Sequence, residues 1–331
     1  MSSVAIPNTL DKIRLHEGND NLKTYFNKLT KENTKEALSL INDNNLNFAS
    51  LFVLKSELKE PELMDDLNLR NKVALEFINE ILDGERRSWV SRNISSDYAQ
   101  IVYSVLKWVF ETGFLDDGLS NDYDEILDMT AILLSKLYKE QKILPAVVDM
   151  IFSRNRNDFL IHDLVWALFE SRDPGSLIMV ASKLLSKDNK DVELANKLLS
   201  FIPGLEKNSD LNSQKKYVAF LNWLEENSLF LHFTGQSLQQ TNRPILYVVV
   251  LEAKYLCKFV SVDTGKLLNS LSQKEKSLLN EFKKLDLDTK TLLSNFSFKM
   301  HEKDINQWDK WIKYPITKQI KIAKSMIGGE Q

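Results

Sequence analysis

Residues 145–204 read PAVVDMIFSRNRNDFLIHDLVWALFESRDPGSLIMVASKLLSKDNKDVELANKLLSFIPG. Pro145, Pro174 and Pro203 lie 29 residues apart, and the segments between them carry apolar residues at helical spacing. Each helical segment is only about three turns long, so it would not be stable alone in water. The stretch therefore predicts two successive helical hairpins that need neighbours to pack against.

The second hairpin has the clearest pattern. Asp173 is a favourable N-cap, and Pro174 occupies the first helical position, where its missing N–H costs no hydrogen bond. A polar turn at 187–190 separates two helices, each with one apolar and one polar face. The residues predicted to face inward are Leu177, Ile178, Ala181, Leu184, Leu185, Val192, Ala195, Leu198, Leu199 and Ile202.

The first hairpin carries polar residues that suggest a binding surface. A short helix follows Pro145, residues 154–157 form a basic polar turn, and Asp158 is predicted to cap a helix that runs to Ser171. This second helix is apolar nearly all round and is expected to lie between layers. A binding surface is predicted from His162, Asp163, Trp166, Arg154 and Arg156. The alternative is a buried histidine and aspartate with local hydrogen bonds.

Residues 145–202 resemble the HEAT and armadillo family of α-solenoids, whose units are short antiparallel helix pairs. The resemblance implies an all-α fold, a right-handed stack of such pairs, and a scaffold or binding surface without catalytic residues. The 29-residue interval is shorter than the roughly 40 residues usual in that family. A helical bundle without repeats is therefore the alternative.

Composition favours an ordinary globular protein rich in helices. The chain has 331 residues, of which 43% are hydrophobic and 27% charged, and only 17 are Gly or Pro. Cys257 is the single cysteine, which excludes an internal disulfide and favours a reducing compartment. The N-terminus lacks a signal-peptide pattern, and charges at Glu252, Lys254 and Lys258 interrupt the most apolar run. A cytoplasmic protein is predicted.

Charge is distributed unevenly along the chain. Residues 206–331 contain 19 Lys and Arg against 14 Asp and Glu, whereas residues 1–205 contain 24 against 32. The two parts therefore carry net charges of +5 and −8. This contrast predicts an acidic helical-repeat domain at 1–205 and a more basic helical domain at 206–331.

The region 229–262 admits two interpretations. Its β-branched and aromatic residues are typical of a small β-hairpin. No Gly, Asn or Pro interrupts 245–260, however, and this favours a buried helix that starts at Pro244. Residues 266–327 are predicted to form four short helices.

An aspartate-rich stretch follows residue 114. Asp116, Asp117 and Asp122 match the DDxxxxD spacing of all-helical isoprenoid synthases, and this resemblance implies Mg²⁺ and diphosphate binding. Gly118 and Asn121 depart from that family because they favour a loop over a helix wall, and no second DDxxD follows. A solvated acidic loop is the alternative interpretation.

A second enzymatic alternative comes from the tryptophan and aspartate of the first hairpin. Trp166 and Asp163 are similar to the residues that line the site of HEAT-like alkylpurine DNA glycosylases. The acidic N-terminal part argues against phosphate binding, so a nucleic-acid partner is not expected.

The C-terminal stretch has the pattern of a binding element. Pro315 divides it, and the second piece is a basic amphipathic helix. Its candidate binding residues are Trp308, Trp311, Lys313, Lys318, Lys321 and Lys324. They predict docking on an acidic protein or on an anionic membrane surface, and the alternative is a terminal helix packed on its own domain.

The sequence thus predicts a non-catalytic interaction or scaffold protein with a protein partner and no cofactor. The alternative is an all-helical enzyme, either Mg²⁺-dependent at the aspartate-rich stretch or acting on DNA bases.

Overall fold

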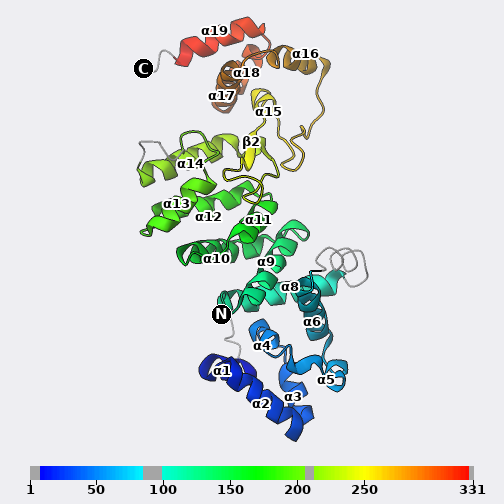
Figure 1. The fold of residues 1–331 in the computed structure, drawn as a ribbon. Helices are drawn as coiled ribbons and strands as arrows, with labels where there is room; N and C mark the ends of the chain where they lie inside the picture. Colours follow the sequence, from blue (N-terminus) through cyan, green and yellow to red (C-terminus); the bar gives the residue numbers. More distant parts are fainter. Residues whose placement is uncertain (1–7, 85–98, 206–211, 328–331) are drawn as a thin grey trace. The chain divides into compact units, whose positions relative to one another are not determined.

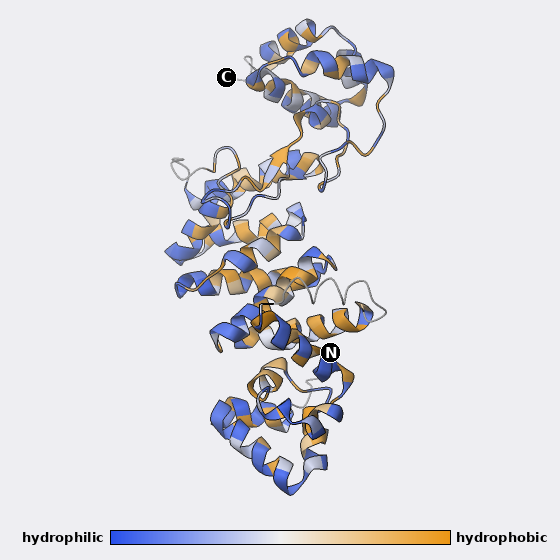
Figure 2. Cartoon of the chain, turned by 45° about the vertical axis from the view of Figure 1, so that its right-hand side comes forward, coloured by the Kyte–Doolittle hydropathy of each residue, from blue (hydrophilic) through white to orange (hydrophobic). Residues whose placement is uncertain are grey.

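The computed structural model describes residues 8–84, 99–205 and 212–327 (Figure 1). Within these residues the fold is all-α, with one small antiparallel sheet of two strands. The predicted all-α fold class is confirmed, and the small β-hairpin that the sequence left as an alternative is present. Figure 2 shows apolar and polar residues alternating along most helices, as expected where one face of a helix is buried.

The chain forms two compact units. The first comprises Met1–Arg154 and Asp163–Ser171, and the second comprises Asn155–His162 and Arg172–Gln331. This division differs from the boundary at residue 205 that the charge contrast predicts. Helix α12 (Leu177–Ser182) packs on α14 (Ser213–Asn227), so residues on both sides of 205 share one unit. The net charge of a segment depends on its composition and does not show which helices pack together.

The first unit is helical throughout its described part. Its α-helices are α1 (Thr9–Glu17), α2 (Asn19–Glu32), α3 (Thr34–Ile41), α4 (Phe48–Val53), α5 (Pro61–Asp65), α6 (Leu69–Leu82), α8 (Ala99–Gly113), α9 (Asn121–Lys136) and the main parts of α10 (Leu144–Arg156) and α11 (His162–Glu170). Its core contains an aromatic cluster in which Phe48 stacks on Tyr123 at 5.5 Å. The Tyr123 hydroxyl donates to the Gly113 carbonyl, and this close approach leaves no room for a β-carbon at Gly113.

In the first predicted hairpin, the first helix is longer than predicted and the second helix is shorter. Helix α10 continues to Arg156, so Arg154 is helical and does not belong to a turn. Asp158 has a φ of 60°, which breaks the chain direction, and α11 begins only at His162. The prediction that Asp158 caps this helix was therefore wrong. Phe159 and Leu160 lie outside it, 58% and 79% exposed.

The second predicted hairpin is confirmed in outline. The Asp173 side chain accepts the Gly175 N–H, and Pro174 opens a 3₁₀ turn, η4 (Pro174–Ser176), that leads into α12. A second 3₁₀ turn, η5 (Lys183–Leu185), precedes α13 (Asn189–Leu198). Most of the predicted inward residues are buried, but Ile178 and Leu185 are 42% and 43% exposed.

The prediction of a helix that starts at Pro244 was wrong, because the first part of that segment contains a strand. Strand β2 (Tyr247–Val249) pairs antiparallel with β1 (Leu231–Phe233), with His232 opposite Val248. The β-branched residues of β2 fit this pleated pairing. The helix formers that follow do form a helix, α15 (Leu251–Tyr255), which is only five residues long.

The four predicted C-terminal helices are confirmed. They are α16 (Gln273–Phe282), α17 (Leu287–Lys303), α18 (Ile305–Trp311) and α19 (Ile316–Ile327). Together with α15 they enclose a core that includes Tyr255, Phe282, Leu293, Trp311 and Ala323. In the described part of the chain, no helix has both the length and the apolar character needed to cross a membrane.

Candidate functional site

Arg154, predicted to contribute to a binding surface, lies in a buried ionic cluster of the first unit. Its side chain is 4% exposed, donates to Asp117 at 2.6–3.0 Å and donates to Asp128 at 2.9 Å. Burial raises the pKa of Asp128 to about 7, although the Arg154 charge acts in the opposite direction. The guanidinium is thus committed to two carboxylates of its own unit and is not available to a partner.

The three aspartates of the aspartate-rich stretch lie beside three different cations. Asp116 accepts two hydrogen bonds from Arg14, at 2.7 and 2.9 Å, while Asp117 pairs with Arg154. Asp122 lies in the first turn of α9, with an oxygen 3.7 Å from the Lys55 ammonium. Among the described residues, no group of three or more His, Cys, Asp or Glu could hold a metal ion.

The other predicted residues of the first hairpin have separate environments. His162 is exposed, whereas Asp163 and Trp166 are half-buried. The Trp166 indole donates to Glu170 at 3.1 Å, and the Lys136 ammonium lies 4.8 Å from the indole centroid. Arg156 pairs with Asp191, whose side chain is only 5% exposed.

The C-terminal stretch packs its aromatic residues on its own unit. Trp311 is 3% exposed in the core, and Trp308 donates to the Ser297 hydroxyl at 2.7 Å. Both indoles are therefore engaged inside the unit. The lysines remain outside and exposed: Lys313 pairs with Asp309, Lys318 lies 3.6 Å from the Tyr314 ring centroid, and Lys321 and Lys324 face solvent.

A cleft of about 990 Å³ lies entirely within the second unit. One wall is the polar face of α13, where Lys190, Glu193 and Lys197 follow one another at helical spacing. Helix α14 contributes Lys216, and the segment before β2 contributes residues 242–245. Residues 155–161 complete the lining with Asn155, Asp158 and Ile161. We refer to this feature as the basic cleft.

The basic cleft has an excess of positive charge. It is lined by four cations, Lys190, Lys197, Lys216 and Arg243, against two carboxylates, Asp158 and Glu193. Lys190 is neutralised locally because its ammonium donates to both Asp158 oxygens at 2.8 Å. The other three cations have no carboxylate partner among the described residues. The cleft therefore attracts anionic groups.

The same cleft offers apolar contact area beside these charges. Phe201 lines it and is held by the Trp223 and Tyr247 rings, at centroid distances of 6.1 and 6.2 Å. Pro244 and the 46% exposed Ile245 approach from the segment before β2. The cleft can thus bury an apolar side chain next to an anionic group.

Sequence reasoning missed the basic cleft because its residues are spread over 155–245. A partial signal was present in the spacing of Lys190, Glu193 and Lys197, which places them on one face of a helix. The sequence predicted Glu193 and Lys197 on the outward face of this helix and Lys190 in the turn before it. Nothing in the sequence indicated that Lys216 and Arg243 would join it.

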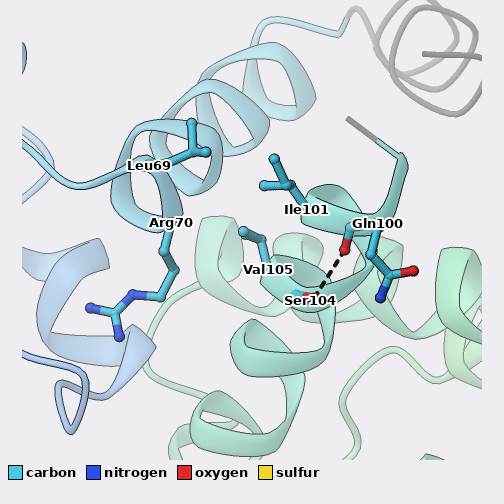
Figure 3. A pocket seen from close by; sticks show the side chains of 6 residues that line it. All are labelled: Leu69, Arg70, Gln100, Ile101, Ser104 and Val105. Carbon is cyan, nitrogen blue, oxygen red and sulfur yellow. Dashed lines mark hydrogen bonds between the residues drawn. The ribbon is translucent and has the colours of Figure 1, made fainter. Parts of the chain in front are cut away.

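The first unit has a smaller pocket of about 340 Å³ between α6 and α8, lined by Leu69, Arg70, Gln100, Ile101, Ser104 and Val105 (Figure 3). Arg70 donates to the carbonyls of Asp43 and Asn44, at 2.9 and 3.2 Å. Its guanidinium also lies 4.3 Å from the Trp108 ring centroid. Arg70 is the one cation among the described residues that line this pocket, and it is already engaged, so we favour the basic cleft as the functional site.

Lys254 is a second residue whose role the sequence did not reveal. Its side chain is 0% exposed, and its ammonium donates to the amide oxygens of Asn227 and Asn295 at 2.8 and 2.7 Å. The nearest carboxylate oxygen, on Glu226, is 4.0 Å away. Burial lowers the pKa of Lys254 to about 8. Full burial leaves this ammonium no access to a ligand.

This buried lysine predicts a pH-dependent stability. The unfolded chain holds the Lys254 proton up to a pKa of 10.5, so between pH 8 and 10.5 it binds more protons than the folded chain. The contribution of this group to the free energy of unfolding therefore rises with pH across that window, by about 3 kcal/mol. Lys254→Met should abolish the rise and exposed Lys276→Met should keep it, in urea unfolding followed by circular dichroism at pH 7.5, 9 and 10.5. Equal pH profiles for the wild type and Lys254→Met would contradict the assignment.

No family model, curated protein or solved structure matches this chain.

Proposed function

We propose that this chain is a non-catalytic interaction protein whose second unit binds an extended acidic segment of a protein partner in the basic cleft. The observation that carries the proposal is the combination, in one cleft, of apolar contact area with three cations that have no carboxylate partner among the described residues. An acidic protein segment offers both carboxylates and apolar side chains, so it matches this lining.

The size of the cleft also supports a protein segment over a small ion. A volume of about 990 Å³ is at the upper end of the range for small-molecule sites, roughly 300–1,000 Å³. The rim is open enough that Lys197 and Arg243 are exposed while Lys216 is buried. Exposed cations of this kind increase the rate of association with an acidic partner, and a buried cation contributes to specificity.

The test is site-specific photocrosslinking of the full chain in its source cells. A photoreactive phenylalanine analogue replaces Ile245 in the cleft or, as a matched control, Leu287, which is 69% exposed in the same unit and does not line the cleft. We expect position 245 to give a discrete protein adduct that mass spectrometry maps to an acidic segment, and position 287 to give none. Absence of an adduct at 245, or the same adduct in equal yield at both positions, would contradict the proposal.

A further inference from the structure

Lys216 is the most unusual of the cations in the basic cleft. It is 8% exposed, although lysines are almost never this buried without a partner. Its ammonium donates one hydrogen bond, to the amide oxygen of Asn196 at 3.0 Å. A lysine ammonium carries three donors, and within the described residues the other two have no protein acceptor.

The surroundings of Lys216 favour the binding of an anion. The residue lies in the first turns of the 15-residue helix α14, near the positive end of the helix dipole, which disfavours a cation. Its one hydrogen-bond partner among the described residues, Asn196, is neutral, and the Asn196 side-chain amide donates a hydrogen bond to the Val192 carbonyl at 2.7 Å. A negative ligand would therefore gain more at this position than at an exposed lysine.

The charge pattern around Lys216 favours a singly charged anion. Glu193 lies one turn before Asn196 on α13 and lines the same cleft, so a dianion beside Lys216 would meet a nearby negative charge. A carboxylate carries one charge and two acceptor oxygens, which suits the two donors left on the ammonium.

We infer that Lys216 binds one aspartate or glutamate carboxylate of the partner segment, with an adjacent apolar side chain of that segment packed against Phe201. This inference rests on the proposed function, and it names the chemical group that the cleft selects. Lys197 and Arg243 attract the segment, whereas Lys216 fixes its register.

The experiment is a selection of random 12-residue peptides displayed on phage against the immobilised full chain. We expect the selected peptides to share one acidic residue next to an aromatic or aliphatic residue. The same selection on Lys216→Met should lose the shared acidic position, and Lys216→Arg should keep an acidic residue because it retains the cation. Lys215→Met is the matched control, since Lys215 is the exposed neighbour on α14 and does not line the cleft.

A double-mutant cycle then assigns the contact. For the best peptide, we expect the acid-to-amide change to weaken binding to wild type about tenfold, and to weaken binding to Lys216→Met less than twofold. Thermal unfolding checks that Lys216→Met and Lys216→Arg are folded. A phosphoserine in place of the acidic residue should bind more weakly than the carboxylate.

The outcomes separate the two proposals. Acidic peptides that crosslink at position 245 but share no fixed acidic position, or an equal effect of the amide change on wild type and Lys216→Met, would overturn the role of Lys216 while the cleft remains a binding site for acidic segments. Tighter binding of the phosphoserine peptide would overturn the preference for a carboxylate. If the full chain selects no peptide at all, both proposals fail.

Discussion

Arg154→Met is expected to lower the free energy of unfolding of the first unit by about 3–5 kcal/mol. The substitution keeps much of the aliphatic volume of the side chain but leaves Asp117 and Asp128 without their shared cation. These carboxylates are only 14% and 13% exposed, so water cannot replace the lost hydrogen bonds in full. The measurement is urea unfolding at pH 8.

Two comparisons isolate the cause of this loss. The deficit of Arg154→Met should shrink at pH 5, because burial raises the pKa of Asp128 and its carboxyl can then be protonated. Lys190→Met removes an exposed pair with Asp158 and should cost about 1 kcal/mol or less. If Arg154→Met costs no more than Lys190→Met, the cluster does not hold the unit together as described.

Trp311→Ala is expected to destabilise the second unit by about 3–5 kcal/mol. The indole is 3% exposed and lies 5.2 Å from the Phe296 ring and 6.2 Å from the Tyr255 ring, measured between centroids. Its removal would leave a cavity beside these rings, between α15 and α17. Chemical unfolding followed by circular dichroism measures the loss.

The matched variant is Trp311→Phe. It keeps an aromatic ring in the core and removes the indole N–H, which has no hydrogen-bond acceptor in the described part of the chain. We expect it to cost less than half as much as Trp311→Ala. An alanine variant as stable as the wild type would mean that Trp311 lies on the surface, as a docking residue would.

The helices were predictable where a local signal specifies them. Asp173 and Pro174 mark a helix start that depends only on neighbouring residues, and the structure has it there. The four helices of 273–327 were equally accessible from periodicity. The hairpin at β1 and β2 was harder, because its pairing joins residues 231 and 249, which no local pattern connects.

For the same reason, most of the candidate site could not be predicted from the sequence. Arg154 has the residue type of a phosphate or partner ligand, and only the tertiary contact with Asp117 and Asp128, 37 and 26 residues away, shows that it is structural. For Lys216 the residue type was misleading in the opposite direction. It looks like any exposed helical lysine, and its burial beside Asn196 depends on how α13 and α14 pack. Residue type predicted neither outcome.

We propose that the basic cleft binds an acidic protein segment through the cations that lack a carboxylate partner among the described residues. The most direct test of this proposal is the affinity of the full chain for the segment crosslinked at position 245, measured by fluorescence anisotropy for the wild type and for Lys197→Glu/Arg243→Glu. Lys274→Glu/Lys276→Glu changes the net charge equally at exposed residues outside the cleft. We predict at least about tenfold weaker binding for the cleft variant and a change below about twofold for the control. Equal affinities for both variants would contradict the account.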